Sequence, residues 1–321
     1  MWPLIKLLPM KTNFQFVRFA KLAAVISIVG ILASLGRAMF PFEPPCGGLN
    51  CGIDFTGGTM IELSTAPKQV DLAAARAAVN ALNVGDPQVQ GVGDGTKAMV
   101  RYQPPAGASA DKVGDEVRAA LTKALGQVSF ESPNVIGAKV SGELFQSGLM
   151  ALGLAILLMM VYIWFRFELQ FGIGAVVALF HDVILTFGII AFFQLEFSLN
   201  TVAAVLTVIG YSMNDTVVVF DRLRENLRKY KRMPLRELID LSINETLSRT
   251  VITGLTAVLA LTGLAVFGGS TLLDMSLVLI FGIVIGTYSS IYVAAPVLLL
   301  FGVKRGQEEA EPLKPPASAR T

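Results

Sequence analysis

Six long apolar runs and one polar segment alternate along the sequence. The runs cover residues 22–40 and approximately Gln146–Phe165, Phe171–Phe193, Leu199–Phe220, Arg249–Phe267 and Leu272–Phe301. A helix rises about 1.5 Å per residue, so a run of about 20 residues crosses a hydrocarbon core about 30 Å thick. The pattern therefore predicts an α-helical membrane protein with six transmembrane helices.

The first run, residues 22–40, has a second interpretation as a cleaved signal peptide. Such a peptide has a shorter apolar region and a small-residue cleavage site. This run is long and closes with Arg37-Ala38-Met39, so we expect a retained helix.

The polar segment, residues 41–145, lies between the first and second runs and has its own pattern. Strand alternation is found at Met60–Leu63, Gln88–Val92, Ala98–Gln103 and Val128–Ser132, and helical spacing at Val70–Leu82 and Asp111–Leu125. The resulting order, β-α-β-β-α-β, is typical of a ferredoxin-like unit. We expect one α/β domain between helices 1 and 2, followed by helices 2–6 within residues 146–301.

Lysine and arginine gather at one end of the predicted helices. They occupy residues 1–21, Arg166, the connection 221–248 and the segment 302–321, whereas the two short connections on the other side have none. Because basic residues stay on the cytoplasmic side, we expect both termini in the cytoplasm and residues 41–145 outside it. The segment 302–321 is expected to be a disordered tail.

The long connection, residues 221–248, combines many basic residues with amphipathic spacing after Pro234. We expect its second half to lie along the membrane surface. A solvated charged loop is the competing interpretation of its first half.

Composition narrows the chemistry. The chain has 321 residues, 53% hydrophobic, with a formal net charge of +2, one histidine and two cysteines. The sequence has too few nitrogen and sulfur ligands for a zinc site of the Cys/His type, so we expect no metal. We also expect no nucleic-acid partner. The sequence has neither a phosphate-binding P-loop nor a G-x-S-x-G nucleophile motif, so we expect no enzyme.

The fourth apolar run contains a carboxyl group, Asp215, preceded by Asn214. An ionisable side chain at membrane depth is costly and is by default a functional-site hypothesis. The alternative is a carboxyl near a helix end, satisfied by water or a base. Arg249 opens the fifth run at a similar expected depth, and Thr253 shares its helix face, so we predict that Asp215 and Arg249 are partners.

Two further polar or small-residue patterns lie within the runs. His181 and Asp182, near the middle of the third run, are either a second station on a proton path or a buried polar pair that orders helix packing. Gly282, Gly286 and Ser290 recur every four residues in the sixth run, which predicts close helix packing.

Cys46 and Cys51 lie in the segment predicted to be outside, where disulfides persist. A bond between them would close a short loop and contribute little stability. Two free thiols are the equal alternative.

Several motifs, in order along nearly the whole chain, resemble the SecD/SecF family of the bacterial Sec protein-export machinery. They are Asp54-Phe55-Thr56-Gly57-Gly58, Ser141-Gly142-Glu143-Leu144, His181-Asp182, Gly210–Asn226, Asn244–Thr250 and Gly286–Ser290. Ile53 stands where the family usually has an aromatic or other bulky residue, and the Cys46–Cys51 segment is not expected of the family.

The resemblance to the SecF half of this family implies half of an arrangement like that of RND-class transporters. It implies a SecD-like partner, association with the SecYEG channel, and proton-driven assistance to an unfolded polypeptide crossing the bacterial inner membrane. Asp215 and Arg249 would belong to the proton-responsive site, with protons as coupling ion and no cofactor. Protonation of Asp215 would weaken its attraction to Arg249 and let the fourth and fifth helices repack.

Two competing functions are half of an RND-type proton-coupled exporter of small molecules and a structural assembly subunit. An exporter predicts a substrate pocket and usually large paired external domains. An assembly subunit predicts that Asp215 and Arg249 tolerate apolar replacement.

Overall fold

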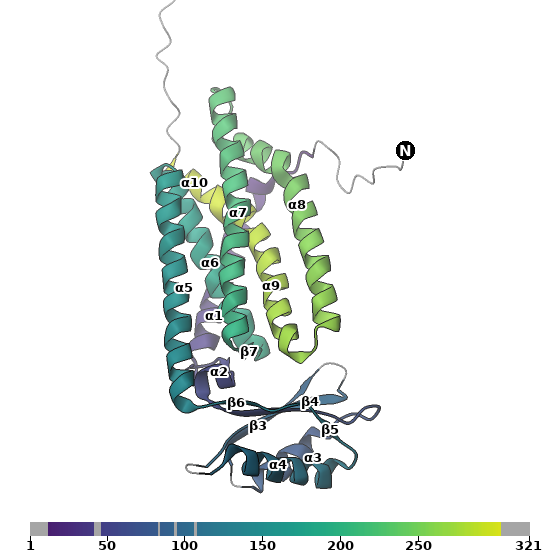
Figure 1. Cartoon of the computed structure of the whole chain (residues 1–321). Helices are drawn as coiled ribbons and strands as arrows, with labels where there is room; N and C mark the ends of the chain where they lie inside the picture. Colours follow the sequence, from purple (N-terminus) through teal and green to yellow (C-terminus); the bar gives the residue numbers. More distant parts are fainter. Residues whose placement is uncertain (1–11, 42–45, 83, 93–94, 106–107, 303–321) are drawn as a thin grey trace, which may run out of the picture.

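The computed structural model describes residues 12–41, 46–82, 84–92, 95–105 and 108–302. A bundle of long helices carries a small α/β domain at one end (Figure 1). The expected cytoplasmic segment 1–21 is described only from residue 12, and the expected disordered tail lies outside the described residues beyond residue 302.

Six helices in the described part of the chain are long and apolar enough to cross a membrane. They are α1 (Ala20–Met39, after the 3₁₀ turn η1, Phe16–Phe19), α5 (Ala138–Arg166), α6 (Leu169–Phe193), α7 (Leu199–Lys229), α8 (Leu235–Phe267) and a last span made of α9 (Ser270–Ser289), the π-helical turn η2 (Ser290–Ala294) and α10 (Ala295–Phe301). The prediction of six spanning helices is therefore confirmed.

The prediction of a long connection at residues 221–248 is wrong. Helix α7 continues to Lys229 and α8 already begins at Leu235, so only five residues join them. The apolar run ends at Phe220 but the helix does not, because the arginine, leucine and glutamate residues after Phe220 are good helix formers. Arg222 also pairs with Glu225 at 2.5 Å, one turn later on the same helix.

The six spans divide into an inner and an outer set. In α6, α7 and the α9–α10 span, 56%, 56% and 50% of the residues in an 18-residue apolar stretch are buried. In the corresponding stretches of α1, α5 and α8 the buried shares are 17%, 11% and 11%. Helix α9 packs against both α7 and α8, and α1 packs against α6. The outer helices therefore turn most of their side chains away from the rest of the chain.

The α/β domain has a sheet in the order β3-β4-β2-β5, with neighbouring strands antiparallel. Its elements are β2 (Gly58–Ser64), α3 (Leu72–Asn80), β3 (Gly85–Val92), β4 (Lys97–Gln103), α4 (Ala110–Leu125) and β5 (Ser129–Phe130). This is the predicted ferredoxin-like topology. Helices α3 and α4 cover one face of the sheet, and the other face is turned toward the membrane helices (Figure 1).

Short elements that the sequence pattern did not predict join the domain to the bundle. They are β1 (Asn50–Cys51), α2 (Ile53–Thr56) and β7 (Glu196–Phe197), together with β6 (Asn134–Ile136), which pairs antiparallel with β2 as the fifth strand of the domain sheet. Strands β1 and β7 pair in parallel, Asn50 beside Glu196, although β7 lies between α6 and α7. The domain is thus paired to the helix connection by main-chain bonds.

Strand β4 is buried on both faces. Val100 and Tyr102 are fully buried on the helix-covered face, while Met99 on the other face packs with Ile53 and Met60. A second apolar layer therefore separates the sheet from the bundle.

Cys46 and Cys51 form a disulfide, with their Cα atoms 6.2 Å apart. The bond lies where the chain leaves α1 and enters β1.

Candidate functional site in the membrane bundle

Asp182, on the inner helix α6, is at the centre of a polar cluster. The carboxyl is 1% exposed. Its Oδ1 lies 2.8 Å from His181 Nδ1, and its Oδ2 accepts hydrogen bonds from Ser289 Oγ at 2.6 Å and from Ser212 Oγ. Both carboxylate oxygens therefore have partners, drawn from three helices.

His181 extends this cluster to the first helix. Its Nε2 lies 3.0 Å from Ser27 Oγ, which lies 3.1 Å from the Tyr288 hydroxyl. Tyr288 in turn donates to the carbonyl of Ala23 at 2.9 Å. One chain of polar contacts therefore links α1, α6, α7 and α9, and it includes both His181 and Asp182.

Asp215, on α7, is also buried, with 3% exposure, but has far fewer partners. Its one hydrogen bond in the described structure comes from Thr287 Oγ1 at 3.4 Å, close to the limit for such a bond. The hydroxyls of Tyr211 and Thr216, beside it along α7, have no hydrogen-bond partner among the described residues. The surroundings of Asp215 are therefore only partly satisfied.

The Arg249 guanidinium is near enough to attract the Asp215 carboxylate electrostatically, but the two predicted partners are not in direct contact. Arg249 is exposed on the outer helix α8, and the described residues contain no ion pair between the two. Asn214 and Thr253 are exposed as well, and Thr253 Oγ1 donates to the Arg249 carbonyl at 2.8 Å. Helical spacing fixes which residues share a face but not the direction in which that face points.

The small residues of α9 bring these groups together. A Cβ added to Gly286 would lie 2.8 Å from Ser212 Cβ, and one added to Gly282 would overlap Val208, so α9 closely approaches α7 at both positions. Ser290 is buried and donates to the Thr287 carbonyl at 2.9 Å. This approach places the α9 hydroxyls beside carboxyl groups on α6 and α7.

A cavity of about 1150 Å³ extends along α1 to the polar cluster. Its lining includes Arg18, Arg236 and Asn244 toward the basic end of the bundle, and Ser27 and His181 deeper inside. The histidine side of the cluster therefore lies beside a cavity that contacts basic residues.

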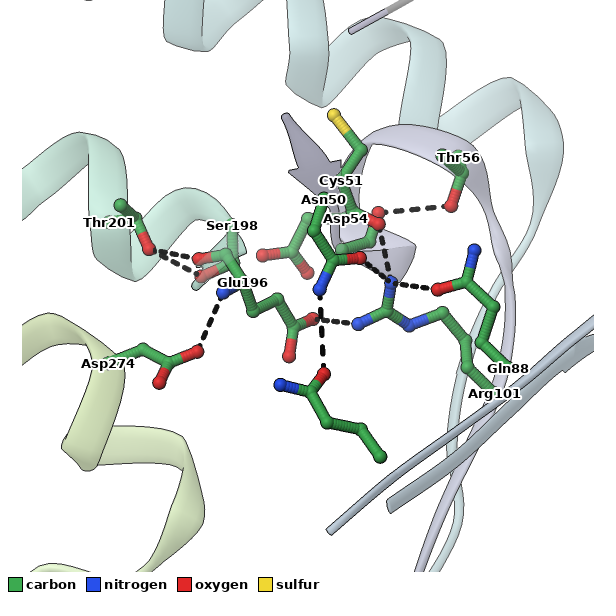
Figure 2. A network of polar contacts seen from close by, with 12 residues as sticks. Asn50, Cys51, Asp54, Thr56, Gln88, Arg101, Glu196, Ser198, Thr201 and Asp274 are labelled. Atoms are coloured by element: carbon green, nitrogen blue, oxygen red, sulfur yellow. Dashed lines mark hydrogen bonds and ion pairs between the residues drawn. The ribbon is translucent and has the colours of Figure 1, made fainter. Parts of the chain in front are cut away.

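A second polar site, missed by the sequence reasoning, joins the α/β domain to the bundle. Arg101 Nη2 on β4 pairs with Glu196 Oε1 on β7 at 3.1 Å, and its Nη1 donates to the Cys51 carbonyl at 2.6 Å (Figure 2). Burial raises the pKa of the Glu196 carboxyl, Arg101 opposes this, and Asp274 and Asp54 add to it.

A sequence signal for that second site existed. Met99 is the one apolar residue on a strand face that otherwise carries Lys97, Arg101 and Gln103, which is a weak sign that this face is covered.

The chain is a multi-helix membrane protein with one ferredoxin-like domain and a buried histidine–carboxylate cluster. These features indicate a class of membrane subunit, and the comparisons with known proteins narrow the class to a family. The family model of the protein export membrane protein SecD/SecF, C-terminal, matches residues 116–304. The SecD/SecF GG motif matches residues 48–68. The chain belongs to the SecD/SecF family and is a multi-pass protein of the bacterial inner membrane.

Curated relatives match over almost the whole length. The protein translocase subunit SecF of Cereibacter sphaeroides is 46% identical over 311 residues, covering 94% of each chain. That of Rickettsia felis is 40% identical over 305 residues, covering 94% of this chain and 96% of the relative.

A solved structure has the same fold. It is the crystal structure of SecDF from Thermus thermophilus, a translocon-associated membrane protein, with a TM-score of 0.80 and 31% identity. The match covers 94% of this chain and 39% of that one, so this chain spans about two fifths of the SecDF chain.

Proposed function

We propose that the chain is the SecF half of a SecD–SecF pair that uses the proton gradient to assist protein export through the SecYEG channel. The passenger is an unfolded polypeptide, protons are the coupling ion, and no cofactor takes part. Asp215 is the proton-responsive carboxyl.

The observation that carries this proposal is the environment of Asp215. A buried carboxylate is normally held by several donors, and Asp182 in the same bundle meets that rule. Among the described residues Asp215 has one long bond, from Thr287. Gain or loss of a proton at Asp215 therefore breaks few existing contacts, which suits a group that titrates during a working cycle.

The exposed face of α7 and α8 supports a SecD-like partner. Asn214 and Arg249 lie within spanning helices and point away from the chain. A charged side chain facing lipid is costly, so a second membrane subunit is the cover that this face requires. Arg249 then lies between Asp215 and that partner, and protonation of Asp215 changes the electrostatic attraction that the interface feels.

The distribution of basic residues supports the orientation of the chain. The last turns of α5 and α7, which carry Arg166 and Arg224, lie at the end of the bundle opposite the α/β domain (Figure 1). By the positive-inside rule this end is cytoplasmic and the domain is outside. The cavity beside Ser27 and His181 approaches from this same end, and it favours His181 and Asp182 as a second proton path.

The decisive experiment replaces Asp215 with asparagine in cells where this chain substitutes for the resident SecF. Completion of export is measured with the gradient intact and collapsed. We expect the gradient-dependent part to fall at least tenfold, equivalent to about 1.4 kcal/mol. The control is Asp221→Asn on the same helix, whose half-exposed carboxyl pairs with Arg166 at the surface.

Three results separate the candidates. Wild-type export by Asp215→Asn, with Arg249→Leu also active, would favour an assembly subunit. Gradient-dependent extrusion of small molecules without a SecD-like partner would favour the exporter. Loss in Asp215→Asn but not in Asp221→Asn supports the export proposal.

A further inference from the structure

The contacts between the α/β domain and the membrane helices include one polar set, which we call the junction. It consists of Asn50–Asp54, Arg101 of β4, Gln194–Leu199 between α6 and α7, and Asp274 of α9 (Figure 2). Only Asp274 and Leu199 belong to spanning helices, at their first turns. The junction therefore lies where the bundle meets the domain.

Arg101 is the positive group of the junction, and several carboxyl groups face it or its partner. Its side chain is 9% exposed and that of Glu196 15%. Beyond Glu196, the Arg101 guanidinium bonds the Cys51 carbonyl and the Asn50 side-chain oxygen, at 2.6 and 3.3 Å. One guanidinium thus holds three groups from two segments far apart in sequence.

The same junction fixes the first turn of α7. The Leu199 N–H donates to Asp54 Oδ2 at 2.8 Å, and Thr201 Oγ1 donates to the Glu196 carbonyl at 2.5 Å. A carboxylate at a helix N-terminus also meets the positive end of the helix dipole. The start of α7 is therefore bonded to the domain by Asp54 and, through Glu196, by Arg101.

Asp215 lies on this same helix. Sixteen residues separate Leu199 from Asp215, roughly 24 Å at about 1.5 Å per residue. An axial shift or tilt of α7 around Asp215 would therefore move the segment that contacts Asp54 and Arg101.

Gly52 shows that the fit at the junction is close. A Cβ added there would lie 2.5 Å from Glu196 Oε1. The backbone of Gly52 has φ −69°, which alanine also adopts. Alanine at this position therefore displaces the Glu196 carboxylate without straining the chain.

We propose that Arg101 and Glu196 are the positioning pair that makes the α/β domain follow the first turn of α7. They couple the helix that carries Asp215 to the sheet of the domain. Without this pair, the domain would follow only its covalent links to α1 and α5. The coupling of the pair to export rests on the proposed function, whereas its positioning role does not.

The first test is hydrogen–deuterium exchange on the full chain in lipid nanodiscs. The readout is the amides of Gly52, Glu196 and Leu199, which bond the Phe197 carbonyl, Asp274 and Asp54. Arg101→Gln should speed their exchange at least tenfold and leave β2 and β4 protected. The control Lys97→Gln, on the same strand, removes an exposed pair with Glu131 at 3.8 Å and should change exchange less than twofold.

Two more variants approach the junction from outside the sheet. Gly52→Ala and Glu196→Gln leave the hydrogen bonds between β2 and β4 intact. If Arg101→Gln loosens the whole domain, these two variants still test the junction by itself. Faster exchange at the junction alone in both supports the pair. Wild-type exchange at the junction in all three variants would overturn the proposal.

The pH dependence distinguishes a positioning pair from a passive contact. Glu196 is faced by Arg101 of β4, Asp274 of α9, Asp54 of α2 and Glu62 of β2. Because its pKa is raised when the domain is docked, the docked state binds more protons than an undocked state with Glu196 in water. Docking therefore strengthens as pH falls through the raised pKa.

Arg101→Gln removes the group that opposes the rise in the Glu196 pKa. Acidification from pH 8 to pH 6 should therefore slow amide exchange at the junction in that variant, after correction for intrinsic exchange rates. The double variant Arg101→Gln/Glu196→Gln should lose this pH response; an unchanged response would overturn the assignment to Glu196.

Export is the separate readout. Arg101→Gln should lower gradient-dependent export at least fivefold. Loosened exchange with wild-type export would overturn the coupling role, and this outcome is distinct from wild-type export by Asp215→Asn, which would overturn the proposed function.

Discussion

Two buried carboxyl groups, Asp182 and Asp215, lie in neighbouring helices of one bundle and have opposite surroundings. Asp182 is bonded by His181, Ser212 and Ser289, whereas Asp215 has one 3.4 Å bond within the described part of the chain, from Thr287. Removing a partner from a fully bonded group leaves donors unsatisfied. A sparsely bonded group instead changes state at little cost. We therefore expect the loss of Asp182 to cost more stability than the loss of Asp215, the carboxyl proposed to respond to the proton gradient.

The largest expected effect comes from Asp182→Asn. An amide has one acceptor oxygen in place of two, so either His181 or the two serine hydroxyls must face its NH2 group. We expect the free energy of unfolding to fall by about 2 kcal/mol or more, measured as the midpoint of denaturation by SDS in mixed micelles. The matched change Asp215→Asn is its control, and equal losses in both variants would end the comparison.

Gly286→Leu tests whether both regions depend on the approach of α9 to α7. A side chain there meets Ser212, so the helices must separate and both carboxyl groups lose α9 hydroxyls. We expect a loss of about 1–3 kcal/mol from overpacking, in the same assay. Gly263→Leu on α8, with no atom near an added Cβ, should remain within about 0.5 kcal/mol of wild type; a comparable loss there would attribute the effect to helix propensity or insertion.

Asp215→Asn itself should change the free energy of unfolding by less than about 1 kcal/mol, because one long bond is at stake and a buried charge is removed. Combined with its expected loss of export, this separates function from stability. A loss as large as that of Asp182→Asn would mean that Asp215 also holds the bundle together.

The smallest expected effect is that of Thr287→Val. It keeps the shape of the side chain and removes the one donor that the described residues supply to Asp215, for a change of about 0.5 kcal/mol or less. Ser289→Ala, two residues away on the same helix, removes a 2.6 Å bond to Asp182 and should cost about 1 kcal/mol. A reversed order would show that the long bond is stronger than its geometry indicates.

The sequence predicted the six spans and the ferredoxin-like order because these follow from hydrophobic periodicity, which is local. It identified both carboxyl groups because their cost in an apolar run is also local. The direction of a helix face is set by tertiary packing, so the spacing could not show that Arg249 is exposed and attracts Asp215 only from a distance. The extension of α7 past Phe220 was missed because helix propensity and ion pairs continue after hydrophobicity ends.

The junction could not be predicted for a different reason. Arg101 and Glu196 belong to segments separated by two spanning helices, and no periodicity relates them. The only hints were a strand with apolar residues on both faces and a lone acidic residue in the short connection Gln194–Ser198. Each of these features indicates that a residue makes a contact but does not identify the residue that it contacts.

The pairing of β1 with β7 has a consequence for how the chain is made. Gln194 Nε2 bonds the Gly48 carbonyl across 146 positions of sequence, and β1 pairs with β7 beside it. At a synthesis rate of about 5–20 residues per second, the β1 segment waits on the order of ten seconds for its partner strand. During biogenesis the ferredoxin-like unit can therefore fold first, and it docks only after the third span has been synthesised and inserted.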